Sequence, residues 1–383
     1  MTKSPNPLER MAWWPLWALR RGVLAVADLL FMGSHRGRPL VVQVYRGYGS
    51  AHGIWLRGRV LEDGGVTEVH EGTPAWENLR NMYRRFRSRA IAGAEVALRV
   101  GEVEKRLITD GRGFFQTALD PLALPPSEDG WHEVVVDLLE PRPEAAVQGR
   151  GRVLVPARGS RFGVISDVDD TVVYTYAFDK VRMVRILLFD NAHARLPFPG
   201  VAAFYRALER GGGAHNPILY VSSSAWNVYD LLRDFMRLND LPAGPLLLRD
   251  MRFSRAGLFG GRRHEHKLDR IREVLATWPD LPFLLIGDSG QHDPELYLRV
   301  VQEHPGRVAA IYLRDVVRTR ARHEEIEGIA EEVRAHGSEA LLVEDTFAAA
   351  RHAAEHGWID AADLEAIDAE RRGDMPPQAQ TLR

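Results

Sequence analysis

The stretch "RFGVISDVDDTVV" (residues 161–173) places three aspartates within four positions, directly after an apolar run. The run "FGVIS" (162–166) predicts a buried parallel strand, because such strands are covered on both faces and read as continuous apolar segments. Asp167, Asp169 and Asp170 then stand together at its carboxyl end. Carboxylates this close repel one another unless a cation offsets their charge. The stretch therefore indicates a parallel sheet with a charged site at its edge.

Beyond about residue 150, short apolar runs alternate with helical patterns. This alternation predicts an α/β fold, a Rossmann-like parallel sheet with helices on both faces. The further strands are expected at 217–222, 282–287, 308–313 and 339–344, and the helices at 200–211, 225–239, 267–279, 293–305 and 323–337.

Polar side chains follow two of these other strands at the point where each strand ends. Ser222, Ser223 and Ser224 follow one, and "GDSGQHD" (287–293) ends the other. Lys267, one of only four lysines, opens the helix before the latter strand. Ligands bind at the carboxyl ends of strands in such sheets, so these groups are expected to share one site. Carboxylates suit Mg²⁺, while hydroxyls and an ammonium suit phosphate oxygens.

Other interpretations of the acidic stretch fit its residue spacing less well. An EF-hand loop from Asp167 needs Gly and Glu where Val172 and Phe178 stand, and a prenyl-diphosphate motif from Asp169 needs Asp where Val173 stands. An acidic turn that caps a helix stays open as a structural alternative.

Two residues outside the acidic stretch also have structural alternatives. Asp293 precedes a proline and could simply cap the helix that follows. Lys267 could be an ordinary surface residue of its helix. Both alternatives stay open at the level of the sequence.

The set D-V-D-D-T, S-S-S, a lone lysine and "GDSGQHD" resembles the four-part signature of haloacid dehalogenase superfamily phosphatases. Three longer segments are similar to the sequences of a narrower group: "GVISDVDDTVV" (163–173), "LYVSSSAWNVYD" (219–230) and "LLIGDSGQHDPELY" (284–297). The members of this group are the Mg²⁺-dependent phosphatidate phosphatases typified by the fungal actin-patch enzyme, whose catalytic domain is related to that of lipins. The resemblance covers about residues 160–345.

The resemblance implies a role for each matching residue. Asp167 would attack phosphorus to form an aspartyl-phosphate and would bind Mg²⁺. Asp169 would act as general acid and base, and would also contact the metal. Ser222 would bind a phosphoryl oxygen with Ser223 beside it, although many relatives carry Asn at the second position. Lys267 would neutralise the nucleophile and the phosphoryl group. In the metal site, Asp288 would be a ligand and Asp293 a ligand or a supporting residue.

The residues before the phosphatase-like part are predicted to form a separate β-rich domain at 36–150. The segment "LITDGRGFF" (107–115) resembles a hairpin of transthyretin-like sandwiches, so a β-sandwich-like domain with a structural or docking role is expected. The Pro-, Gly- and Arg-rich stretch 141–160 indicates a boundary. The phosphatase domain is then expected at 151–365, followed by a disordered tail at 366–383.

Membrane contact is a further expectation. Residues 1–35 carry Trp13, Trp14 and Trp17 beside paired arginines, which suits a membrane interface or a helix packed on its own domain. No apolar stretch reaches the length of a membrane span. Only about 28 residues separate Thr171 from Gly200, where superfamily members insert a cap, so a small or absent cap is expected. An open site suits a bulky substrate such as a lipid.

The net charge of −2 gives no indication of nucleic acid binding, and the absence of cysteine excludes disulfides and thiol chemistry. We therefore expect a Mg²⁺-dependent phosphatidate phosphatase that yields diacylglycerol and phosphate, placed in the cytoplasm or peripherally on the inner membrane face. Two alternatives stay open. One is a related phosphatase for another phospholipid, a protein or a soluble ester, and the other is an inactive lipid-binding module.

Overall fold

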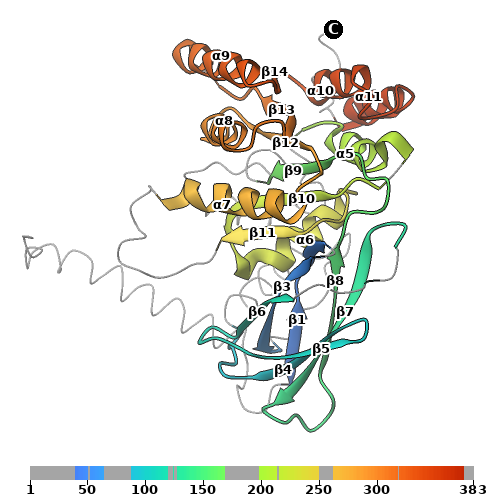
Figure 1. Cartoon of the computed structure of the whole chain (residues 1–383), viewed down its shortest axis with the longest axis vertical. Helices are drawn as coiled ribbons and strands as arrows, with labels where there is room; N and C mark the ends of the chain where they lie inside the picture. The colour runs from blue at the N-terminus through green and yellow to red at the C-terminus, as the bar shows by residue number, and fades with distance from the viewer. Residues whose placement is uncertain are drawn as a thin grey trace, which may run out of the picture.

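The computed structural model of the protein contains two β-sheets, one above the other in Figure 1. It describes residues 39–50, 52–63, 88–119, 124, 127–168, 198–213, 215–249, 262–317 and 319–374. The expected membrane-interfacial segment (1–35), Asp169 and nearly all of the expected cap region lie outside these residues. None of the helices within the described ranges is long and apolar enough to cross a membrane.

The upper sheet in Figure 1 is the predicted parallel sheet. Its six strands follow the order β11-β10-β9-β12-β13-β14, and every neighbouring pair is parallel. The strands are β9 (Gly163–Asp167), β10 (Ile218–Ala225), β11 (Leu246–Arg249), β12 (Phe283–Asp288), β13 (Val308–Arg314) and β14 (Glu339–Val343). Five were predicted from their apolar runs. The sixth, β11, has only four residues, too few to give a clear pattern.

Helices cover both faces of this sheet, as the sequence predicts. Val164 of β9 belongs to the core under α5, α6, α10 and α11, whereas its neighbour Ile165 belongs to the core under α7, α8 and α9. Successive residues of a strand point to opposite faces, so one apolar run supplies both cores. The helices are α5 (Val201–Arg210), α6 (Tyr229–Leu238), α7 (Arg262–Thr277), α8 (Asp293–Glu303), α9 (Arg320–Ala335), α10 (Thr346–Glu355) and α11 (Asp363–Asp374).

The strand order changes direction at the centre of the sheet. β9 is the first strand in sequence and lies between β10, the second, and β12, the fourth. The chain therefore builds the sheet outward from β9 in one direction and then in the other, which is the arrangement of doubly wound folds. Ligands of doubly wound sheets bind at this switch point, and Asp167 and Asp288 end the two strands that flank it, β9 and β12.

The N-terminal sheet is mixed and has eight strands. They are β1 (Leu40–Val44), β2 (Gly47–Ser50), β3 (Gly53–Glu62), β4 (Glu95–Val100), β5 (Val103–Ile108), β6 (Phe114–Leu119), β7 (Trp131–Glu140) and β8 (Gln148–Leu154). Val42 of β1 and Val96 of β4 share one core although other strands separate β1 from β4. The expected sandwich-like packing thus takes the form of one sheet that curls around a common core.

The segment 107–115 does not form the expected hairpin. Asp110 builds the predicted turn, since its Oδ1 accepts hydrogen bonds from the amides of Arg112 and Phe114 at 2.8 and 3.0 Å. However, β5 pairs with β4, whereas β6 pairs with β3. The turn therefore carries the chain between strands that do not pair with each other, which a local pattern does not reveal.

Two domain limits differ from those expected. β8 runs to Leu154 within the N-terminal sheet, and β9 begins at Gly163, so the first sheet extends a few residues beyond 150. The first half of the tail expected to be disordered, residues 366–374, belongs to helix α11. This helix packs on α5, where Glu370 accepts a hydrogen bond from the Ala203 amide at 2.8 Å. Residues 375–383 lie outside the described residues.

Gly149 allows the curled sheet to close. A Cβ atom at this position of β8 would lie 2.4 Å from the backbone oxygen of Val42 on β1. We expect Gly149→Ala to lower the free energy of unfolding by about 1–3 kcal/mol, because backbone atoms must shift. Urea denaturation of the full chain measures this. Gly328→Ala is the matched control on α9, where a Cβ meets nothing within 4 Å, so a neutral or stabilising effect is expected. Equal effects of both substitutions would contradict the close approach.

Candidate active site

Asp167 is the last residue of β9 and is 1% exposed. Its strand is buried throughout, and Asp167 pairs in register with Val221 of β10. Ser222 follows Val221 directly, so the register brings the serine to the edge of the sheet beside Asp167. Both side chains are buried. A buried carboxylate at the centre of a sheet requires compensation by positive charge or hydrogen bonds.

Asp288 ends β12 and is fully buried. Its Oδ1 accepts hydrogen bonds from the amides of Gly290 and Gln291 at 2.7 and 3.0 Å, which holds the loop after the strand. Gly287 makes the arrangement possible, because a Cβ there would lie 2.7 Å from Oδ2 of Asp293. Gly287, the first glycine of "GDSGQHD", is therefore favoured because the Asp293 carboxylate lies close to the backbone of β12.

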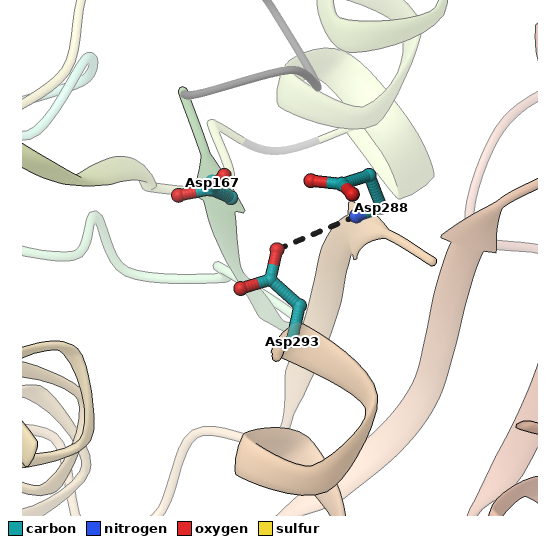
Figure 2. A group of neighbouring side chains, drawn as sticks. All are labelled: Asp167, Asp288 and Asp293. Atoms are coloured by element: carbon teal, nitrogen blue, oxygen red, sulfur yellow. Dashed lines mark hydrogen bonds between the residues drawn. The ribbon is translucent and has the colours of Figure 1, made fainter. Parts of the chain in front are cut away.

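Asp293 is the first residue of α8 and is 1% exposed. The helix has no side-chain cap at its N-terminus, so the capping alternative for Asp293 does not hold. Its Oδ1 instead lies 3.0 Å from Nζ of Lys267, and its Oδ2 accepts the amide of Asp288 at 3.4 Å. Figure 2 shows this last bond as a dashed line, with the three carboxylates converging from β9, β12 and α8.

Lys267 projects from α7 between two of these carboxylates and is only 4% exposed. Its Nζ lies 2.7 Å from Oδ1 of Asp167 and 3.0 Å from Oδ1 of Asp293. Helix α7 begins at Arg262, earlier than the expected start at residue 267, and this places Lys267 in its second turn. The alternative of an ordinary surface lysine is therefore wrong.

The charges of this cluster do not balance. Asp167, Asp288 and Asp293 each offer a carboxylate oxygen, and these oxygens lie within 4.8 Å of one another. One ammonium against three carboxylates leaves a formal charge of −2 on these four groups. Burial and the negative charges of Asp293 and Asp167 raise the pKa of the nearby Tyr297 hydroxyl well above its usual value. The excess of carboxylates over ammonium among these four groups is the kind of arrangement that a bound cation stabilises.

Ser222, Ser223 and Ser224 form what we call the serine segment. Ser222 is fully buried, and its Oγ accepts the Ser224 amide at 3.0 Å. A serine hydroxyl can donate one hydrogen bond while it accepts another. Ser223 is only partly buried. The structure thus brings Asp167, Lys267, Asp288 and Asp293 together directly, and Ser222 by strand register.

Sequence reasoning missed Arg314, which ends β13 and stands opposite Asp288 in the strand register. It is a second cation at the same edge of the sheet. Its position directly after a predicted strand was the available signal.

Together, the fold and site define an α/β protein with an acidic cluster at the switch point of a doubly wound sheet. Residues 162–315 match the family model of the catalytic domain of phosphatidate phosphatase APP1. This match confirms, for that part of the chain, the resemblance to phosphatidate phosphatases that the motifs indicate. The matched residues include Asp167, the serine segment, Lys267, Asp288 and Asp293.

Two curated relatives match part of this chain. Phosphatidate phosphatase APP1 of Saccharomyces cerevisiae is 30% identical over 153 residues, which are 40% of this chain and 25% of the relative. An uncharacterised protein of Schizosaccharomyces pombe is 25% identical over 158 residues, with the same coverage of 40% and 25%. The chain thus spans about a quarter of the length of these relatives. A carbohydrate acetylesterase from Xanthomonas citri superposes with a TM-score of only 0.24 at 13% identity, covering 58% of this chain and 63% of that one.

Proposed function

We propose that this protein is a divalent-metal-dependent phosphatidate phosphatase of haloacid dehalogenase type. The observation that carries the proposal is the buried ammonium of Lys267 held between Asp167 and Asp293, inside the region that matches the phosphatidate phosphatase family. An acidic residue neutralised in this way at a strand end suits a nucleophile that must approach an anionic phosphate.

The donor set fits Mg²⁺. All three acidic groups offer carboxylate oxygens, the donors that Mg²⁺ prefers, and these oxygens lie within 4.8 Å of one another. Asp167 and Asp288 would be the direct ligands. One carboxylate oxygen of Asp293 contacts Lys267 and the other accepts the Asp288 amide. Asp293 would therefore orient Lys267 and Asp288. The bound ion would supply positive charge to the carboxylates and the phosphoryl oxygens.

The chain's own residues would carry two chemical steps. In the first, a carboxylate oxygen of Asp167 attacks phosphorus while the bond from phosphorus to the glycerol oxygen breaks. Asp169 protonates the departing alkoxide, giving diacylglycerol. In the second, Asp169 takes a proton from a water that attacks the same phosphorus, and the bond to Asp167 breaks to release phosphate. Ser222 and Lys267 would hold the phosphoryl oxygens throughout.

A lipid substrate is supported by the family match, because residues 162–315 match the catalytic domain of a phosphatidate phosphatase.

Phosphate release from phosphatidate in mixed micelles tests the proposal. We expect release that stops when EDTA removes divalent ions and returns when Mg²⁺ is added back, because the carboxylates then regain their compensating charge. p-Nitrophenyl phosphate serves as the soluble comparison and is expected to react more slowly.

The other outcomes separate the alternatives. Activity on the soluble ester alone would favour a broader phosphatase. Vesicle binding without release from any ester would favour the inactive lipid-binding module. Release that EDTA leaves unchanged would contradict the metal.

A further inference from the structure

The serine segment is not held by regular strand pairing. β10 pairs with β11 at Val221 and Leu247, and next at Ala225 and Arg249. Three residues of β10, 222–224, therefore stand against the single residue Leu248 of β11. Extra residues of this kind leave the ladder and bend the strand. How the chain is fixed directly after the serine segment therefore contributes to the position of the segment.

The chain is fixed at Trp226, and the N-terminal sheet supplies the contacts. The ring of Tyr45 stacks on Trp226 with centroids 5.0 Å apart. The guanidinium of Arg57 lies 4.8 Å from the Trp226 ring centroid and 4.3 Å from that of Phe114. Arg57 is 4% exposed, and attraction between a cation and an aromatic ring is strongest where water is excluded. We call Tyr45, Arg57, Phe114, Trp226 and Tyr229 the aromatic anchor.

The start of α6 is held in the same way. Tyr229 lies 4.4 Å from Tyr45 between ring centroids, and its hydroxyl accepts the Arg46 amide at 2.9 Å. Gln43 donates to Asp230 at 2.9 Å. Side chains from β1, β3 and β6 and the chain around them thus enclose the turn that links the serine segment to α6.

From these contacts we infer that the N-terminal sheet positions the serine segment through the aromatic anchor, with Tyr45 and Arg57 as positioning residues. The sheet is then part of the unit that binds phosphate, in place of the separate domain with a structural or docking role that its sequence suggested. The role in binding phosphate rests on the proposed function, whereas the positioning itself does not.

Hydrogen exchange in the full chain tests the positioning. The Ser224 amide reports on the serine segment, and the amides of Gly290 and Gln291 report on the carboxylate loop of the same site. Arg57→Met is expected to accelerate exchange at Ser224 at least about tenfold while the other two amides change less than about twofold. Arg99→Met, at an exposed ion pair of the same sheet, is the matched control and is expected to change none of them.

Binding of inorganic phosphate in the presence of Mg²⁺ gives a second measurement. Tyr45→Ala is expected to weaken phosphate binding about fivefold, and Tyr45→Phe to restore it because the ring stack returns. Should Tyr45→Ala fail to fold, Arg57→Met takes its place. Unchanged exchange at Ser224 in Arg57→Met, or equal acceleration at all three amides, would overturn the inference. A wild-type chain that does not bind phosphate would instead count against the proposed function.

Discussion

Asp167→Asn is expected to fold like the wild-type chain and to release phosphate from phosphatidate at least about 1,000-fold more slowly. An amide oxygen is a poor nucleophile and does not carry the charge that a metal ligand needs. The shape of the side chain is kept, and Lys267 still has Asp293 as a partner 3.0 Å away. The substitution therefore removes chemistry while it leaves most of the packing in place.

Initial rates at saturating Mg²⁺ measure this effect, and circular dichroism shows whether the fold is kept. Asp269→Asn is the matched control, because Asp269 is an exposed residue of α7 that pairs with Arg272 at 3.0 Å. It is expected to leave the rate within about twofold of wild type. A rate near wild type in Asp167→Asn would remove Asp167 from the proposed mechanism.

Lys267→Met is expected to lower the free energy of unfolding by about 3–5 kcal/mol in metal-free buffer near pH 7, a cost typical of a broken buried ion pair. The side chain keeps its approximate length, but Asp167 and Asp293 lose the ammonium that lies 2.7 and 3.0 Å from them. Each carboxylate is nearly fully buried, so water replaces that partner poorly. Urea denaturation measures the loss.

Added Mg²⁺ should recover a larger part of the stability in Lys267→Met than in wild type, because an ion that binds the folded state supplies the missing positive charge. Lys105→Met is the matched control, since Lys105 lies on an exposed part of β5, and a change within about 0.5 kcal/mol is expected. A loss below about 1 kcal/mol in Lys267→Met would show that the carboxylates do not depend on the lysine.

Much of the α/β fold can be predicted from the sequence, because a buried strand appears there as a continuous run of apolar residues. β9 and β12 are covered on both faces, so their residues are apolar until the strand ends at Asp167 and Asp288. Residues that end neighbouring parallel strands meet at one edge of the sheet. That rule is enough to place both carboxylates in one site from the order of the residues alone.

Other features depend on partners that are distant in sequence. The sequence left open whether Asp293 caps its helix. Only the folded structure shows that its carboxylate pairs with Lys267, which is 26 residues away. Helix α11 looked like a polar tail because much of its surface is charged, yet Glu370 bonds the backbone of α5. Nothing local to Arg57 indicates that it lies between Phe114 and Trp226.

The sequence by itself therefore determined the class of fold, five of the six strands of the parallel sheet and the acidic residues at the ends of β9 and β12, since these follow from periodicity and burial. Only the tertiary structure decided the ion pairs of Lys267 and the contacts of Asp293 with Lys267 and Asp288. It also decided the contact between the N-terminal sheet and Trp226, which follows the serine segment. The physical reason is that an apolar pattern in the sequence indicates only that a residue is buried. Which group it contacts there is set by the packing of elements far apart along the chain.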